Sequence, residues 1–351
     1  MHHLPPAPQP EAAAAAQPAP LSDPTALRLV GDIGGTHARF ALVRGPQGRP
    51  AAQHTLSTGA YPDLASAVAA YLQAVGARPV EAAIAIACAI EGDELRMTNN
   101  RWQFSVEATR RRLGLQRLLM LNDWEAMAYA VPAFQPPDLL HLGGGAPVAG
   151  APCALLGPGT GLGVSSLVRS RGGEWVAIAG EGGHVSVAPG NEREADILRV
   201  LWTEHAHVSA ERLVSGMGLE NLYRAIARLD GVAPQPLAAA EVCARALARA
   251  DAQCEEALLS FCSLLGNVAG NLALTLGARG GVYFGGGILG RIGADYLLER
   301  SPLRRSFEAK GRFAPYLQRV PTYLIRAEQP ALLGAAIALG VQPGEAGPDK
   351  D

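Results

Sequence analysis

The sequence predicts an α/β fold, and three observations support this class. Short β-branched and aliphatic runs begin at Leu27 and are separated by glycine-rich turns, and helical periodicities alternate with them along the chain. Two of the runs, EAAIAIACAI (81–90) and RLLMLND (117–123), are continuously apolar, as expected for strands buried on both faces. Alternating strands and helices are typical of α/β domains.

Length, charge and cysteine content limit the function classes. A chain of 351 residues is long enough for two domains with separate cores. Lys and Arg total 30 against 32 for Asp and Glu, so we expect no binding to nucleic acid or to an acidic membrane. We predict no transmembrane helix, because no apolar run reaches roughly 18 to 20 residues. Reduced core residues are expected at Cys88, Cys153, Cys243, Cys254 and Cys262, which form no C-x-x-C or C-x-C pair.

The first part of the chain contains a tail, two predicted helices and a connection. Residues 1–26 are dominated by Pro and Ala, and we expect a disordered cytoplasmic tail, because the alanine run 12–16 is too short for a signal-peptide core. Helices are predicted over 62–75 and 124–130. The Pro-rich segment VPAFQPPD (131–138) suits a connection between two lobes.

The second part of the chain repeats the opening pattern. CALLGPGTGLGVSSLV (153–168) is again an aliphatic run, a glycine turn with a threonine and a second β-like run, which suggests two related lobes. Asn191, followed by Glu194, is predicted to cap a helix. The apolar face of that helix would consist of Ile197, Leu198, Leu201 and Trp202.

The remaining elements are predicted to be helical, apart from one strand. A long helical region runs from 241 to about 277, where Gly266 and Gly270 would permit close helix approach. VPTYLIRA (320–327) predicts a strand. Residues from 330 to about 340 predict a final helix, with proline at its first position.

The turn in LRLVGDIGGTHARFALV (27–43) holds an acid, three glycines and a threonine between two strands. Backbone N–H groups at glycines can converge on an anion, so phosphate is the natural ligand. Asp32 would repel a bare phosphate but can hold hydrated Mg²⁺, and Thr36 adds a hydroxyl donor. Taken alone, the stretch is equally compatible with a tight hairpin. It matches neither a Walker loop nor a Rossmann fingerprint, since a strand follows the turn.

Two further glycine clusters favour the phosphate interpretation. The turn 157–163 flanks Thr160 with Gly159 and Gly161, so that two turns could grip one polyphosphate. GGVYFGGGILG (280–290) has three adjacent glycines, which would let an adenosine lie against the backbone.

Polar residues that suit a sugar substrate lie near these turns. Recognition of hydroxyl groups requires carboxylates and amides. Asn122 and Asp123 end a predicted strand, Glu181 and His184 stand in GEGGH, and Glu211 stands in HVSAER. We take Asp123 as the candidate general base, and it can also act as the N-cap of the following helix.

Two clusters have alternative interpretations. A divalent-metal site or, more simply, a mixed polar helix end fits Glu204, His205, His207 and Glu211, which lack the helical H-x-x-x-H spacing. An ordinary turn with one buried aromatic residue, or a rim that orients substrate hydroxyls, fits Thr98, Asn99, Asn100 and Trp102.

Seven motifs in order along residues 27–340 resemble those of the bacterial ATP-dependent glucokinase family: GDIGGTHARFAL, ACAIEGDELRMTNNRW, LNDWEAMA, GPGTGLGV, GEGGHVSVAP, HVSAERLVSGMGL and GGVYFGGGI. The resemblance implies an actin-like (ribonuclease H-like) ATPase fold with two lobes around a cleft, and a homodimer. The implied small lobe comprises 27–134 plus 330–343, the large lobe 135–329, and a flexible tail 344–351.

The resemblance also implies ligands for individual residues. Glucose would be bound by Asn122, Asp123, Glu181, His184 and Glu211, with Asp123 facing the 6-hydroxyl and Asn99 as an additional contact. ATP phosphates and Mg²⁺ would lie at Gly31, Asp32, Gly34, Gly35, Thr36, Gly157, Gly159, Thr160 and Gly161, with Asp32 holding the metal through water. Adenosine would lie near Gly285, Gly286 and Gly287.

Two comparisons refine the resemblance. His37 stands where the family pattern usually has an asparagine, which affects the details of the first turn. Related ROK-type sugar kinases usually carry C-x-C-G-x-x-G-C, and none of the cysteines fits that motif. The zinc-independent glucokinase group is therefore favoured.

The implied reaction is transfer of the ATP γ-phosphoryl group to the 6-hydroxyl of D-glucose, the first step of glycolysis, in the cytoplasm. A kinase for another hexose is an alternative, because the polar residues do not fix every epimer. A non-catalytic sugar-sensing regulator is a second alternative, but it needs a DNA-binding module, and residues 1–26 are too Pro-rich for a helix-turn-helix.

Overall fold

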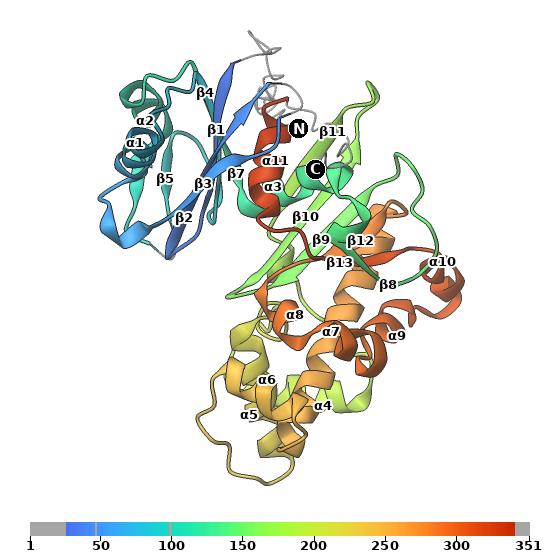
Figure 1. The fold of residues 1–351 in the computed structure, drawn as a ribbon. Helices are drawn as coiled ribbons and strands as arrows, with labels where there is room; N and C mark the ends of the chain where they lie inside the picture. Colours follow the sequence, from blue (N-terminus) through green and yellow to red (C-terminus); the bar gives the residue numbers. More distant parts are fainter. Residues whose placement is uncertain (1–25, 46–47, 98–99, 341–351) are drawn as a thin grey trace, which may run out of the picture.

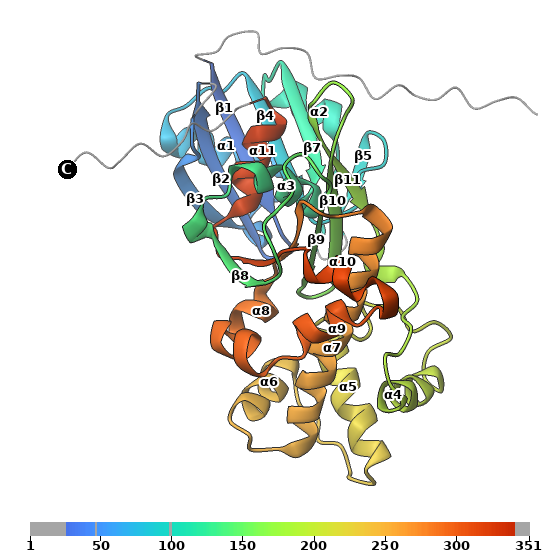
Figure 2. The same cartoon turned by 90° about the vertical axis from the view of Figure 1, so that its right-hand side faces the viewer.

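The computed structural model describes residues 26–45, 48–97 and 100–340, which form two large sheets with helices packed against both (Figure 1). Figure 2 shows the same two sheets after a quarter turn, with most of the helices gathered at the far end of the second sheet. The predicted α/β class is confirmed. The tail 344–351 and residues 1–25 of the predicted N-terminal tail lie outside the described residues.

The first sheet has the strand order β3-β2-β1-β4-β7. β1, β2 and β3 are antiparallel neighbours, whereas β4 and β7 run parallel to β1. The strands are β1 Leu27–Ile33, β2 His37–Arg44, β3 Ala51–Ser57, β4 Glu81–Ile86 and β7 Arg117–Asn122. The helices packed on this sheet are α1 Leu64–Val75, α2 Val106–Arg112, α3 Asp123–Ala130 and α11 Pro330–Ala338.

Alternate side chains of β1 enter different cores, because successive residues of a strand point to opposite faces. Leu29 packs in the cluster that contains Tyr71 of α1, whereas Val30 packs in the cluster that contains Leu332 of α11. Both faces are therefore covered, which explains the unbroken apolar runs. The same alternation turns Asp32 toward the α11 face.

The second sheet repeats this arrangement. Its order is β11-β10-β9-β12-β13-β8, in which β9, β10 and β11 are antiparallel neighbours and β12 and β13 run parallel to β9. The repeat predicted from the glycine turns thus extends to five strands, with β8 added beyond β13. The strands are β8 Leu139–Gly143, β9 Cys153–Pro158, β10 Leu162–Arg169, β11 Trp175–Gly180, β12 Gly281–Phe284 and β13 Thr322–Ile325.

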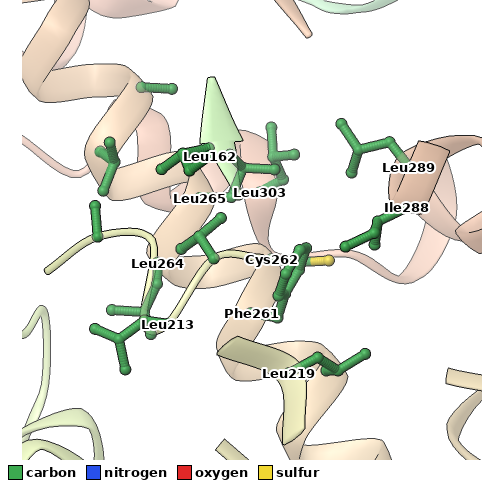
Figure 3. Packing of buried hydrophobic residues seen from close by; sticks show 14 of the residues in the cluster. Leu162, Leu213, Leu219, Phe261, Cys262, Leu264, Leu265, Ile288, Leu289 and Leu303 are labelled. Atoms are coloured by element: carbon green, nitrogen blue, oxygen red, sulfur yellow. The ribbon is translucent and has the colours of Figure 1, made fainter. Parts of the chain in front are cut away.

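A helical layer built around α7 contains the largest core. Figure 3 shows Phe261, Cys262 and Leu264 of this helix among the buried residues of that core. Gly266 allows a close helix approach, as predicted, and the structure identifies the partner as α9, because a Cβ there would lie 2.1 Å from the Leu303 carbonyl oxygen. The helices are α4 Glu192–Trp202, α5 Gly216–Leu229, α6 Ala239–Leu247, α7 Ala252–Leu276, α8 Gly287–Ile292, α9 Leu303–Glu308 and α10 Ala314–Gln318.

By length and composition alone, helix α7 could cross a membrane. The sequence prediction had excluded any apolar stretch of that length. That exclusion was wrong as a statement about length and hydropathy. However, 61% of its most apolar window is buried inside the protein, and it packs against α5, α6 and α9. These contacts identify it as a core helix.

Helices α3 and α11 lie between the two sheets (Figure 1). They pack closely, because a Cβ at Gly334 of α11 would lie 1.6 Å from the carbonyl oxygen of Ala126 in α3. Helix α3 continues from β7 of the first sheet but also packs against β10 and β11 of the second. It therefore joins the two halves of the molecule.

Several predictions needed correction. The helical region 241–277 is two helices, because the chain turns at Arg249 (φ 54°) and the Asp251 side chain then caps α7. Asn191 caps α4 as predicted, but Trp202 is 54% exposed and does not join the buried face. All five cysteines are buried and free, as expected.

The remaining elements are short. A two-stranded sheet is formed by β5 Glu94–Arg96 and β6 Gln103–Ser105. Single helical turns occur at Thr58–Ala60, Val131–Ala133, Pro136–Asp138, Gly182–His184, Tyr296–Arg300 and Gly311–Phe313. The predicted connection 131–138 thus consists mainly of two such turns before β8.

Candidate active site

A cleft of about 930 Å³ lies between the two sheets. Its walls come from the β1–β2 turn, the start of α3, the β9–β10 turn, the end of β11, the start of α8 and the start of α11. A volume of this size is at the upper end of small-molecule sites, and it is large enough for a sugar and a nucleotide together.

Most of the predicted site residues line this one cleft. They are Asp32, Gly34, Gly35, Asn122, Asp123, Gly157, Gly159, Thr160, Gly161, Glu181, His184, Glu211, Gly286 and Gly287. Gly31, Thr36 and Gly285 are not among the lining residues. Asn99 lies outside the described residues. The fold therefore brings together groups that are up to 255 positions apart, from 32 to 287.

Asn122, rather than Asp123, is the N-cap of α3. Its Oδ1 accepts hydrogen bonds from the backbone N–H of Trp124 (2.9 Å) and Glu125 (3.4 Å), and the Glu125 carboxylate accepts from the Asn122 N–H (3.3 Å). This capping box replaces the cap predicted at Asp123. The Nδ2 group donates one of its two hydrogens to the Cys88 carbonyl oxygen (3.3 Å), and this bond does not use the other hydrogen.

Asp123 is the first residue of α3, and its carboxylate lines the cleft. Burial, together with the negative charges of Asp32 and Glu181, raises the pKa of Asp123 from 3.8 to about 6. A hydrogen bond from the Trp124 backbone N–H, at 3.0 Å from Oδ1, acts in the opposite direction. The carboxylate is thus mainly ionised at neutral pH and is a better proton acceptor than an exposed aspartate.

Asp32 and Arg39 form an ion pair beside the first glycine turn, with Nη1 and Oδ2 3.1 Å apart. They are register partners across the β1–β2 hairpin. Burial raises the pKa of Asp32, and the Arg39 charge partly offsets this effect. A hydrogen bond from the Gly34 N–H to the His37 carbonyl oxygen (2.9 Å) closes the turn. His37, which stands where the family usually has asparagine, therefore contributes to the turn through its backbone.

Glu211 is tied to the second glycine turn. Its Oε2 accepts a hydrogen bond from the Leu162 N–H at 2.9 Å, and a Cβ at Gly161 would lie 2.3 Å from the same oxygen. Gly161 therefore provides room for this carboxylate. Glu181 and His184 are more exposed, with Oε2 and Nε2 3.9 Å apart. They form the rim of the cleft rather than its floor.

The predicted ligand-binding glycines divide into two kinds. Gly159 and Gly287 have no atom within 4 Å of a Cβ position, so their backbone faces open space. At Gly157 a Cβ would lie 2.3 Å from the Trp124 ring, and at Gly31 it would lie 2.7 Å from the Ile84 side chain. The latter two glycines are required by packing, which the sequence alone did not reveal.

Apart from Glu211, which lines the cleft, the described members of the two alternative clusters that form side-chain contacts have ordinary structural roles. Glu204 forms ion pairs with Arg224 and Arg228, as a polar helix end would. The His207 ring lies 3.0 Å from the His184 carbonyl oxygen. Trp102 is fully buried, and its Nε1 donates to the Tyr61 carbonyl oxygen (2.9 Å), which agrees with a turn holding one buried aromatic residue.

Sequence reasoning missed Arg39, Trp124, Met127 and Cys88 as lining residues. For Arg39 a signal was present: if the turn is a tight hairpin, residues equally far from its centre face each other, and Arg39 is then opposite Asp32. The other three depend on tertiary packing.

The chain is similar to proteins of one enzyme family along most of its length. A family model described as Glucokinase matches residues 29–341. The chain is 56% identical over 313 residues to a glucokinase of Chromobacterium violaceum (89% of each protein). It is 52% identical over 314 residues to one of Aromatoleum aromaticum (89% of the chain, 94% of that protein). A crystal structure of glucokinase from an Antarctic psychrotroph superimposes with a TM-score of 0.83 at 35% identity (89% and 98% covered).

Proposed function

The chain belongs to the glucokinase family, and on this premise we propose that its cleft transfers the γ-phosphoryl group of ATP to the 6-hydroxyl of glucose. It is an ATP-dependent glucose kinase with the actin-like ATPase fold of its structural relatives. The observation that carries the site assignment is that Asp123, the glycine turns and Glu211 line one cleft.

Asp123 is proposed to orient the sugar hydroxyl and to accept its proton. A bond forms between the glucose O6 and the γ-phosphorus, the bond to the β–γ bridging oxygen breaks, and ADP leaves with the electron pair. The transition state of phosphoryl transfer is loose, so positioning and charge neutralisation dominate catalysis. The raised pKa suits a group that is ionised before the step and protonated after it.

Asn122, Glu181, His184 and Glu211 are proposed to bind the remaining sugar hydroxyls, and Asn99 is a further proposed contact outside the described residues. Carboxylates and an amide can each pair with hydroxyl groups, and an unmatched buried partner is costly, which gives specificity. The Leu162 hydrogen bond holds Glu211 in place before the substrate arrives.

The turns at Gly34–Gly35 and Gly159–Gly161 are proposed to hold the ATP phosphates through backbone N–H groups, with Gly286 and Gly287 near the adenosine. Mg²⁺ fits the donor set, because Asp32 offers a mostly buried carboxylate of which only Oδ2 is engaged with Arg39. Bound Mg²⁺ would neutralise phosphate charge. Since it keeps much of its water shell, Asp32 is proposed to hold it through water.

The two sheets are proposed to be the cores of two lobes, one of residues 27–134 plus 330–343 and the other of 135–329, that close on glucose. Closure would exclude water, a competing phosphoryl acceptor. Small-angle scattering should show compaction when glucose is added, and an unchanged radius of gyration would argue against closure.

The enzyme is further proposed to act as a homodimer in the cytoplasm, as the family resemblance implies. Light scattering coupled to size-exclusion chromatography should give twice the mass of 36.5 kDa. A monomer at working concentration would contradict the dimer.

A coupled ADP-release assay tests the proposed specificity. The panel contains glucose, mannose, fructose and N-acetylglucosamine, each with ATP and Mg²⁺. Glucose should give the highest kcat/KM. A higher value for another sugar would reassign the substrate, and no sugar-dependent ADP release would refute the kinase assignment.

A further inference from the structure

Trp124 lies against three glycines at or beside the two cleft-lining glycine turns of the second sheet. A Cβ built at Gly163 would lie 1.7 Å from its Nε1, one at Gly157 would lie 2.3 Å from its Cη2, and one at Gly285 would lie 3.3 Å from the same ring atom. These glycines belong to β10, to β9 and to the turn after β12. The indole therefore occupies space that three glycines leave open.

The backbone of Trp124 is bonded on both sides of the cleft. Its N–H donates to Oδ1 of Asp123 at 3.0 Å, and its carbonyl oxygen accepts from the Ser165 hydroxyl of β10 at 2.8 Å. The residue thus links the carboxylate that follows β7 of the first sheet to strand β10 of the second, which leads out of the second glycine turn.

An ordinary core aromatic residue would be surrounded by apolar side chains. Trp124 does pack against an apolar cluster that includes Leu155 and Leu167, but it also lines the cleft, and three glycines lie close to its ring there. A small displacement of this ring would change the distance between Asp123 and the turns, and positional errors near 1 Å are costly in catalysis.

We propose that Trp124 is a positioning residue that fixes Asp123 relative to the glycine turns of the second sheet. The proposal rests on the proposed roles of Asp123 and of those turns. It also gives Gly157 and Gly163 a second role besides ligand binding: their lack of a side chain leaves space for the Trp124 indole.

Kinetics of two Trp124 variants test the proposal. Trp124→Ala should lower kcat roughly 10- to 100-fold. KM for glucose should change less than about threefold, because Glu211 has its own anchor in Leu162. Trp124→Phe should recover most of the turnover, since a smaller ring still fills the space. Trp202→Ala, at a 54% exposed position on α4, is the matched control and should be unaffected.

Gly163→Ala provides an independent test if Trp124→Ala folds poorly. The added methyl must displace the indole, so kcat should fall about tenfold or more. In the Trp124→Ala background the same change should cost little, because the space is already free. An equal loss in both backgrounds would overturn the proposal, and so would a Trp124→Ala enzyme with unchanged kcat.

Asp123→Asn separates failure of this inference from failure of the proposed function. If Trp124 acts through Asp123, the double variant should turn over no more slowly than Asp123→Asn alone. Fully multiplicative losses would refute the inference. Normal turnover of Asp123→Asn itself would instead refute the proposed function.

Discussion

Replacing Asp123 with Asn should lower activity and raise stability. The pKa of Asp123 in the folded protein is about 6, against an ordinary value of 3.8. Each pKa unit, a tenfold change in proton affinity, corresponds to about 1.36 kcal/mol. The ionised carboxylate therefore costs the fold ~3 kcal/mol at neutral pH, as an upper bound. Asparagine carries no charge, and its Oδ1 can still accept from the Trp124 N–H.

The sign of the pH dependence follows from linkage. The folded protein binds the Asp123 proton more tightly than the unfolded chain, so this site's contribution to stability is complete below about pH 4 and is lost as pH rises through about 6. The stability advantage of Asp123→Asn should thus be small near pH 4 and reach its full size above pH 6. Turnover should fall by ~10²- to 10⁴-fold, the usual contribution of a general base.

Urea unfolding at several pH values and a coupled ADP-release assay measure the two effects. Asp196→Asn is the matched control: it removes a half-exposed charge from the Arg199 ion pair on α4 and should change neither quantity by much. Near-normal turnover of Asp123→Asn would refute its role as the base. A variant less stable than the parent at pH 7.5 would refute the electrostatic reasoning.

Three further predictions concern the cleft and its frame. The kcat/KM of the parent enzyme should fall below a pH of about 6, because protonated Asp123 cannot accept the hydroxyl proton; a flat profile from pH 5 to 8 would contradict this. Gly161→Ala should raise KM for glucose roughly tenfold by displacing the Glu211 carboxylate, as loss of one buried hydrogen bond predicts, and calorimetric titration with glucose should show the same weakening. Gly334→Ala should destabilise the fold by ~1–3 kcal/mol or more, because its methyl would meet a backbone carbonyl of α3, whereas Gly290→Ala, which meets nothing within 4 Å, should have little effect in thermal melts.

Local pattern predicted much of the site. Continuous apolar runs identified β4 and β7, and the end of β7 located Asp123 correctly at the cleft. The two strand-turn-strand units in the sequence suggested two related lobes, and the two sheets share their strand order over five strands. These features depend on residues close in sequence, where periodicity and turn chemistry are informative.

Features set by distant contacts could not be predicted in the same way. Asn122 and Asp123 are both good N-cap residues, and only the hydrogen bonds of Asn122 decide between them. Gly157 looks like a phosphate-turn glycine in sequence, but its lack of a side chain is explained by Trp124, 33 positions earlier in the numbering. Trp202 has helical spacing with Leu198 but lies at the end of α4, beyond the packed surface.

The position of α11 has a consequence for biosynthesis. One face of the sheet made by residues 27–122, including Val30 and Ala83, is covered in part by α11, whose residues 330–338 are synthesised after every strand of both sheets. Until these residues leave the ribosome, the face has only the part of its native cover that α3 provides, and a nascent chain would expose the rest to chaperones or to other nascent chains. Ending translation before Pro330 should therefore give a product that aggregates, although every strand of both sheets is present.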